Sequence, residues 1–224
     1  MITIAAEVTP VVEEYLESIW RLEEKSGIAS TGDVSKDLQV AMGTVTNTVQ
    51  RLEKMGLITH IPYRGMRLTD EGRRIALDVI RRHRLTERLL TDVLEVDWSK
   101  VHDEACKLEH SLSREIVKSL EKRLGNPKTC PHGNPLPTTL GEIVEEEAEP
   151  LSALSSGDRG VVVKITSERA DLLEYFGTLN IVPGSTIRVE QRAPFDGPIT
   201  IEVSGVSHAL GLEVAAYIWI KKID

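Results

Sequence analysis

The chain has 224 residues, 41% hydrophobic and 28% charged, which is typical of a folded globular protein and argues against a disordered one. No apolar run is long enough to span a membrane, and the amino terminus lacks the features of a signal peptide, so we expect a cytoplasmic protein with no membrane partner. The net charge of −8 argues against a nucleic-acid partner, but residues 44–74 carry six basic and three acidic residues, so DNA is not excluded.

The first 74 residues are expected to form a winged helix-turn-helix domain. Apolar residues recur at helical spacing from about residue 11 to residue 25, and Ser30 caps a short second helix. After a turn around Met42, a third helix is expected over residues 44–56, with Gly56 as its end. Two short strands around a basic turn follow, and this order of elements is the layout of a winged helix.

The third helix is the predicted recognition helix. Small hydroxyl and amide side chains crowd its exposed part, although such residues are mediocre helix formers. They suit hydrogen bonds with base edges and phosphates, so the expected partner is double-stranded operator DNA. The alternative is an ordinary polar helix. The predicted DNA-binding residues, including one from the turn between the strands, are Thr44, Thr46, Asn47, Thr48, Gln50, Arg51 and Arg64.

Residues 75–140 are expected to form a helical domain for metal binding and dimerisation. Asp70 is expected to cap a long helix, and further helical patterns run over residues 101–112 and 113–124. Winged-helix repressors usually bind palindromic sites as homodimers, because the two-fold axis of the protein matches that of the site. This apolar helical segment is the expected dimer interface.

The remainder is expected to contain a linker and a β domain. Residues 141–153 are acidic and proline-containing, and the acidic run Glu145–Glu147 is interpreted as solvated. Residues 154–224 contain short β-branched segments separated by turn residues, which favour a small SH3-like barrel. The expected fold class is therefore α+β, with a winged helix-turn-helix, a helical dimerisation domain and an SH3-like domain.

Six potential metal ligands lie close together in the helical region. Several are three or four residues apart, so they share helical faces. Imidazole, thiolate and carboxylate groups together suit a first-row transition metal. The alternative is that two helices merely carry polar surface residues. The six residues are His83, Glu87, His102, Cys106, Glu109 and His110.

The segment RRHRLTERLLTDVLEVDWSKVHDEACKLEHSLS resembles the signature of the diphtheria-toxin-repressor family of iron-dependent regulators, and the resemblance covers the whole chain. It implies a metal-dependent transcriptional repressor, not an enzyme, with a FeoA-type SH3-like domain and two metal sites per protomer. The implied ancillary site consists of His83, Glu87 and His102, completed from the tail, where Glu168 and Asp171 are candidates. The implied primary site consists of Cys106, Glu109 and His110 with one ligand from the first helix.

The resemblance leaves the choice of metal between two types. Iron-type members have a methionine in the first helix, where this chain has Glu14; manganese-type members resemble this chain there and have a second acid, as Glu17 is here. Those members generally lack the cysteine that stands here as Cys106. A thiolate favours softer metals, so Fe(II) is preferred, Mn(II) is the alternative, and Co(II), Ni(II) or Zn(II) are surrogates.

An enzymatic alternative and the remaining cysteine and histidine residues are also interpreted from the sequence. A metallohydrolase using the same cluster is the alternative from a different functional class, although no hydrolase motif is present. Cys130 and His132 are interpreted as structural, because the neighbouring prolines fix a turn. His60 and His208 are interpreted as ordinary surface residues.

Overall fold

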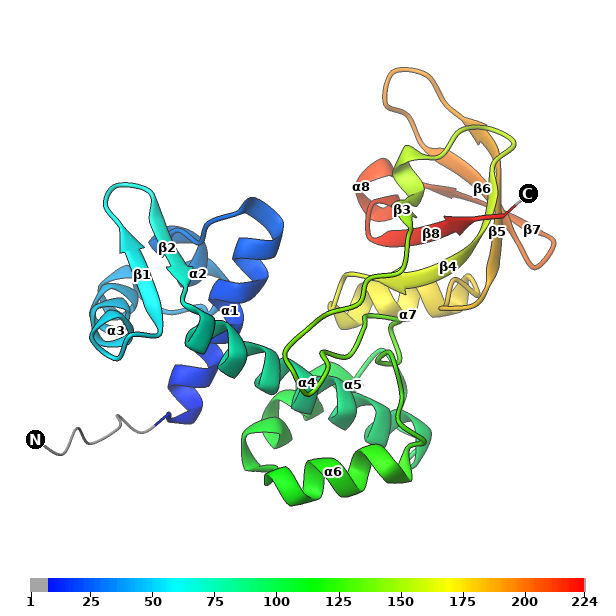
Figure 1. Cartoon of the computed structure of the whole chain (residues 1–224). Coiled ribbons are helices and arrows are strands. Elements are labelled where there is room, and N and C mark those ends of the chain that lie inside the picture. The colour runs from blue at the N-terminus through cyan, green and yellow to red at the C-terminus, as the bar shows by residue number, and fades with distance from the viewer. Residues whose placement is uncertain (1–7, 224) are drawn as a thin grey trace, which may run out of the picture. The chain divides into compact units, whose positions relative to one another are not determined.

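The computed structural model describes residues 8–223 (Figure 1). Contacts divide the chain into two compact units. The first unit runs to Arg82 and includes Pro137–Glu142, and the second contains His83–Leu136 and the chain from Ile143 onward. Helix α4 (Asp70–Asp92) begins in the first unit and ends in the second. Every helix in the described part of the chain is too short or too polar to cross a bilayer.

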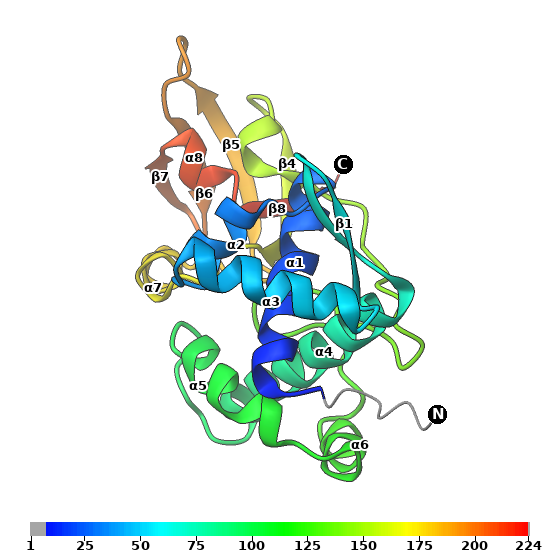
Figure 2. The same cartoon turned by 90° about the vertical axis from the view of Figure 1, so that its left-hand side faces the viewer.

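The first unit contains a winged helix-turn-helix, as predicted. Its buried residues come from all three helices and from the hairpin, so the hairpin packs as part of one core. Figures 1 and 2 show the hairpin beside the third helix. The two strands pair antiparallel. The elements are α1 (Pro10–Ser26), α2 (Thr31–Asp37), α3 (Met42–Lys54), β1 (Ile58–Ile61) and β2 (Gly65–Leu68).

Two helix starts differ from the sequence-based prediction. Helix α3 begins at Met42, where a turn was expected, because Ala41 in an extended conformation accepts the first backbone hydrogen bonds, from Thr44 and Val45. Helix α4 begins at Asp70 itself, and the Thr69 hydroxyl accepts a hydrogen bond from the Gly72 amide at 3.2 Å. A threonine cap therefore replaces the predicted aspartate cap.

The helical part of the second unit consists of the end of α4, then α5 (Val101–Leu108) and α6 (Arg114–Arg123). The helix expected to continue to residue 112 tightens into a 3₁₀ turn, η1 (Glu109–Ser111). Ser113 caps α6 through a hydrogen bond from the Ile116 amide at 3.3 Å. The buried residues that join α4, α6 and the proline-rich segment are Leu85, Leu120, Cys130 and Leu136.

The carboxyl-terminal part of the second unit is a six-stranded sheet with the order β3-β8-β4-β5-β6-β7, in agreement with the predicted SH3-like domain. All neighbouring strands are antiparallel. The elements are β3 (Glu149–Pro150), η2 (Leu151–Ala153), β4 (Arg159–Ile165), α7 (Ala170–Thr178), β5 (Thr186–Arg192), β6 (Ile199–Val203), β7 (Val206–Leu210), α8 (Leu212–Ala215) and β8 (Ile218–Lys222).

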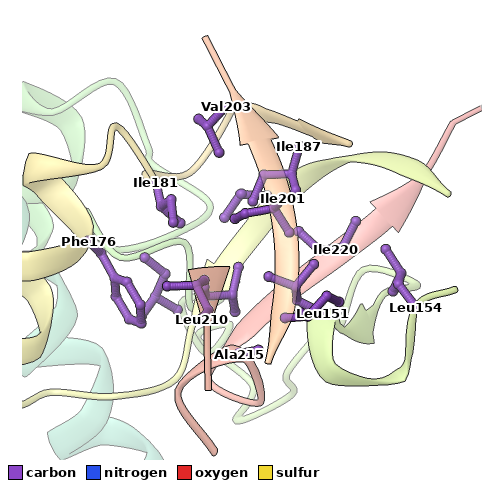
Figure 3. Packing of buried hydrophobic residues seen from close by; sticks show 14 of the residues in the cluster. Leu151, Leu154, Phe176, Ile181, Ile187, Ile201, Val203, Leu210, Ala215 and Ile220 are labelled. Atoms are coloured by element: carbon purple, nitrogen blue, oxygen red, sulfur yellow. The ribbon is translucent and has the colours of Figure 1, made fainter. Parts of the chain in front are cut away.

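The core of this sheet domain is aliphatic, with one aromatic anchor. Figure 3 shows Phe176 of α7 among the aliphatic side chains of the sheet, near Leu210. Phe176, Ile187, Ile201 and Ile220 have no exposed surface. Because apolar residues alternate along β5, β6 and β8, one face of each strand fills the core and the other carries polar groups.

The acidic run before β3 is exposed to solvent, as interpreted, and two of its three glutamates also pair with lysines. Glu145 lies 2.5 Å from Nζ of Lys164, and Glu146 lies 2.6 Å from Nζ of Lys221. The physical reason is that β3 pairs with β8, which brings the acidic segment beside lysine-bearing strands. Most of these groups are exposed, so each pair contributes little by itself.

The proline-rich turn packs against the end of β4. The Ile165 amide donates to the His132 carbonyl at 2.8 Å, and the Asn134 amide donates to the Ile165 carbonyl at 3.0 Å. Gly133 has a φ of +86°, and a Cβ at this position would lie 2.1 Å from the Val163 carbonyl oxygen. Only glycine fits here, because both the backbone conformation and the close approach exclude a side chain.

Gly133→Ala is therefore expected to destabilise the protein strongly. Gly157→Ala is the matched control, because Gly157 has a φ of +95° but no atom lies within 4 Å of the position that its Cβ would occupy. Both variants carry the backbone cost of a positive φ, whereas only Gly133→Ala adds a clash, which we expect to cost about 2 kcal/mol more. Urea denaturation followed by circular dichroism measures the difference, and equal losses would contradict the importance of the contact.

Candidate metal centres and DNA-binding surface

Three predicted ligands from two helices converge in the second unit, and we call them the Cys106 cluster. It consists of His83 on α4 with His102 and Cys106 on α5, whose ligand atoms lie within 4.8 Å of one another. His83 Nε2 is 3.1 Å from His102 Nδ1, and Cys106 Sγ is 3.7 Å from His102 Nε2. Donors around one tetrahedral ion are separated by roughly 3.3–3.8 Å, so this spacing fits a transition metal.

Carboxylates surround the Cys106 cluster. Oε2 of the buried Glu109 lies 2.6 Å from His83 Nδ1, and its Oε1 lies 3.3 Å from His110 Nε2. From the sheet domain, Glu168 Oε2 lies 3.6 Å from His102 Nε2. The structure therefore brings five helical candidates and one tail candidate together.

The second tail candidate, Asp171, points elsewhere. Its carboxylate lies 2.6 Å from the Arg169 guanidinium, and 69% of its side chain is exposed. It also accepts a hydrogen bond from the Leu172 amide at the start of α7. Among the described residues, the contacts of Asp171 are thus those of a helix start, which was the alternative interpretation of its spacing.

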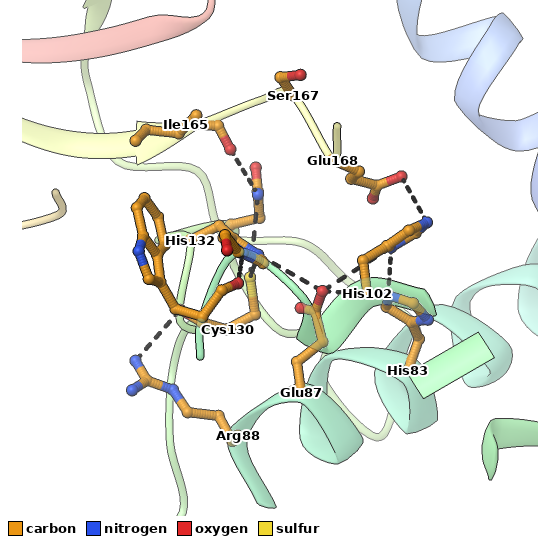
Figure 4. Close-up of polar contacts among 12 residues, drawn as sticks. His83, Glu87, Arg88, His102, Cys130, His132, Ile165, Ser167 and Glu168 are labelled. Carbon is orange, nitrogen blue, oxygen red and sulfur yellow. Dashed lines mark hydrogen bonds and ion pairs between the residues drawn. The ribbon is translucent and has the colours of Figure 1, made fainter. Parts of the chain in front are cut away.

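A second group of potential ligands, which we call the Cys130 cluster, consists of Glu87, Cys130 and His132. All three are buried. Glu87 Oε1 lies 3.4 Å and Cys130 Sγ lies 3.9 Å from His132 Nδ1. Figure 4 shows the Glu87 carboxylate between His132 on one side and His83 and His102 on the other. Glu87 therefore lies between the two clusters.

The hydrogen bonding of His132 is that of a metal-binding histidine. Its Nε2 donates to the Trp98 carbonyl at 2.8 Å, because a carbonyl can only accept. Its Nδ1 faces Glu87 and Cys130. Histidines that bind metals usually donate their other ring N–H to a carbonyl or carboxylate in this way. This donor set fits a metal ion.

The sequence interpretation of Cys130 and His132 as structural did not consider this role. The two residues do fix a buried turn, but they also join Glu87, which precedes them by more than forty positions. The sequence feature that could have indicated a metal-ligand role is the spacing of Cys130 and His132, which are two residues apart. Glu87 could not be assigned to this group from spacing, because it lies on α4 whereas Cys130 and His132 lie on a turn.

The charges in the two clusters are strongly coupled. Burial by itself lowers the pKa of His83, but hydrogen bonds with Cys106, Glu109 and Glu87 raise it well above its usual value. Burial likewise lowers the pKa of His132, whereas its contacts with Cys130 and Glu87 raise it to about 10. Burial raises the pKa of the Cys106 thiol, and hydrogen bonds with His102 and His83 outweigh this and lower it. The histidines, the Cys106 thiol and the carboxylates of the two clusters thus shift one another's pKa values through direct contacts.

The two acids predicted to be first-helix ligands lie on α1, in the first unit. Glu14 is exposed. Glu17 is 7% exposed, and its Oε1 lies 2.7 Å from Arg21 Nη2 one turn later on the same helix. Their role as ligands stays a prediction.

The predicted DNA-binding residues lie on α3 and in the hairpin turn of the first unit. The six predicted residues on α3 are exposed except for Thr48, which is half-buried, and Arg64 is exposed in the turn of the hairpin. The Thr46 hydroxyl donates to the Met42 carbonyl at 3.0 Å. Two further side chains of this region are exposed: Met42, at 61%, in the first turn of α3, and Tyr63 beside Arg64.

The remaining histidines lie outside both clusters. His60 is an exposed residue of β1, and His208 is a partly exposed residue of β7. Neither belongs to a group of potential ligands within the described residues. Their interpretation as ordinary surface residues is consistent with these positions.

Comparisons with known proteins match all three parts of the chain. Residues 7–66 match the family described as iron dependent repressor, N-terminal DNA binding domain. Residues 69–138 match the iron dependent repressor, metal binding and dimerisation domain, and residues 149–222 match the FeoA domain.

Individual proteins are similar over nearly the whole chain. The iron-dependent repressor IdeR of Mycobacterium tuberculosis is 34% identical over 97% of this chain and 99% of its own. The diphtheria toxin repressor of Corynebacterium diphtheriae is 34% identical over 94% of this chain and 96% of its own. A solved manganese-dependent transcriptional repressor in complex with manganese is 34% identical, with a TM-score of 0.88, over 95% of this chain and 100% of its own.

Proposed function

Because the chain belongs to the family of iron-dependent repressors and is a metal-dependent transcriptional repressor, we propose that Fe(II) activates it to bind operator DNA. The observation that carries the choice of metal is that each cluster contains one cysteine, Cys106 or Cys130. Thiolate and imidazole ligands suit Fe(II), whereas Mn(II) prefers oxygen ligands.

We assign the ligands of two metal ions from the contacts in the second unit. The first ion is held by the Cys106 cluster, with Glu109, His110 and Glu168 as the acidic and imidazole groups around it. The second ion is held by the Cys130 cluster. A divalent ion supplies positive charge and a fixed coordination geometry to these buried groups.

We infer that helix α4 transmits the effect of metal binding from the second unit to the first. His83 and Glu87 lie on the part of α4 in the second unit, and the same helix begins in the first unit directly after the hairpin. Shared ligation holds α4, α5 and the proline-rich turn together. If one conformation of the protein binds both the metal and operator DNA more tightly than the others, each ligand raises the population of that conformation. Metal binding then increases the affinity for DNA, and DNA binding increases the affinity for metal.

The DNA contacts follow from the exposed side chains of the first unit. Amide and hydroxyl groups of α3 face base edges in the major groove, and Arg64 contacts a phosphate. Met42 adds an apolar side chain suited to a thymine methyl group.

In the helical part of the second unit, Leu94, Leu108 and Ile116 are 59%, 42% and 51% exposed, and we assign them to the homodimer interface.

A manganese-responsive repressor is the second candidate. Two carboxylates on α1, Glu14 and Glu17, and the similarity to a manganese-dependent repressor favour it. Carboxylate ligands suit Mn(II), whereas the two cysteines do not. The metal that activates at the lower free concentration decides between the candidates.

We expect DNA binding to require metal. Duplexes are first selected from a randomised pool with anaerobic, Fe(II)-loaded protein, and their affinity is then measured with buffered Fe(II), with buffered Mn(II) and with a chelator. Coupling between two sites is typically 1–3 kcal/mol, so the selected duplex should bind about 5- to 150-fold more tightly with Fe(II) than with the chelator. Equal affinity in both conditions would contradict the proposal, and activation by Mn(II) at lower concentration would favour the manganese candidate.

A further inference from the structure

Arg88 follows the ligand Glu87 on α4 and binds the backbone that carries Cys130. Its Nε donates to the Thr129 carbonyl at 2.8 Å, and its Nη2 donates to the Cys130 carbonyl at 3.2 Å and to the Thr129 hydroxyl at 3.3 Å. The Arg88 side chain is 26% exposed. Figure 4 shows the guanidinium beside the Cys130 turn, away from the two histidines of α4 and α5.

The Cys130 turn, residues 129–134, is held from two sides. On one side, the His132 carbonyl and the Asn134 amide bond to Ile165 of β4. On the other side, the guanidinium of Arg88 provides the hydrogen bonds from α4. The position of the Cys130 thiol relative to the Glu87 carboxylate therefore depends on two consecutive residues of one helix, one bearing the ligand and one binding the backbone.

We propose that Arg88 is a positioning residue for the metal in the Cys130 cluster, an inference that rests on the proposed function of that cluster. Its planar guanidinium contacts two successive carbonyl groups with two different nitrogens, which fixes both the distance and the orientation of the turn. A lysine ammonium is a single point of charge on a flexible stem and does not reproduce this fork. Groups that orient ligands typically change metal affinity 10–100-fold.

Co(II) is a suitable probe because cobalt–thiolate bonds give a charge-transfer absorption band. The chain has two cysteines, so the band reports on Cys130 alone in Cys106→Ser protein and on Cys106 alone in Cys130→Ser protein. Arg88→Lys and Arg88→Gln are made in each background. Arg84→Gln is the matched control, because Arg84 also donates to a carbonyl of the proline-rich segment, that of Pro135, and among the described residues its hydrogen bonds do not include Thr129 or Cys130.

The expected result is that both Arg88 variants weaken Co(II) binding in Cys106→Ser protein at least tenfold, while Co(II) binding in Cys130→Ser protein stays within about twofold of its parent. Arg84→Gln should leave the Cys130 band within the same limit. Unfolding of the metal-free variants is followed by circular dichroism. If Arg88→Gln fails to fold, Arg88→Lys, which keeps the charge near Asp92, decides the outcome.

Two results would overturn the inference: an unchanged Cys130 band in the Arg88 variants, or equal losses in both backgrounds that follow a loss of metal-free stability. A merely structural role predicts the second result. If the Cys130 cluster does not bind metal at all, the Cys106→Ser parent shows no cobalt–thiolate band before any change at Arg88. This result is therefore distinguishable from a failure of the inference about Arg88 alone.

Discussion

His83→Gln is expected to abolish metal-dependent DNA binding. His83 is 3% exposed, and its two ring nitrogens lie 2.6 Å from Glu109, 3.1 Å from His102 and 3.3 Å from Glu87. Replacing it removes one proposed ligand and also a contact of Glu87, which belongs to the other cluster. Groups that only orient ligands cost 10–100-fold in affinity, so the loss of a ligand should cost about 100-fold or more.

Glutamine is chosen because it fills much of the same volume and can still donate a hydrogen bond to Glu109. Alanine would leave a cavity next to buried carboxylates and would confuse lost binding with lost folding. His208→Gln, on β7 and outside both clusters, is the matched control. Metal affinity is measured by competition with a chelator of known strength, and metal-stimulated DNA affinity by anisotropy. Wild-type values for both in His83→Gln would exclude His83 as a ligand.

The parts of the fold that depend on local pattern could be predicted from the sequence. The amphipathic pattern of α1 and the glycine stop after α3 are read from neighbouring residues, and the structure has both. The features that could not be predicted are those that depend on a partner distant in the sequence. The acidic residues Glu145 and Glu146 are paired because β3 adds to β8, and no feature of the acidic run itself predicts that strand.

The same distinction applies to the metal ligands. His102 and Cys106 are one helical turn apart on α5, so their proximity could be predicted from spacing alone. Cys130 and His132 lie on a turn whose position depends on hydrogen bonds to Ile165 and Arg88, from distant segments. Residue spacing therefore identified candidates within a helix, but it did not identify the cluster that α4 and the turn form together.

Asn47→Ala is expected to reduce sequence-specific DNA binding and to leave metal binding unchanged. Asn47 is exposed on α3, in the first unit, whereas both clusters belong to the second. Its amide makes no hydrogen bond within residues 8–223, so it is available to pair with the N6 and N7 edge of an adenine. Such a pair provides about 1–3 kcal/mol of discrimination, so affinity for the selected duplex should fall roughly 5- to 150-fold.

The salt dependence of binding separates base recognition from a general loss of affinity. If Asn47 reads a base, Asn47→Ala binds the selected duplex more weakly, while its affinity for an unrelated duplex and the slope of affinity against salt stay unchanged. Gln191→Ala, which removes an exposed amide from β5 in the sheet domain, is the control and should change neither affinity. An equal loss on both duplexes would assign Asn47 to the phosphate backbone. Because metal affinity is measured on the same preparation, an unchanged value also shows that recognition and activation depend on different residues.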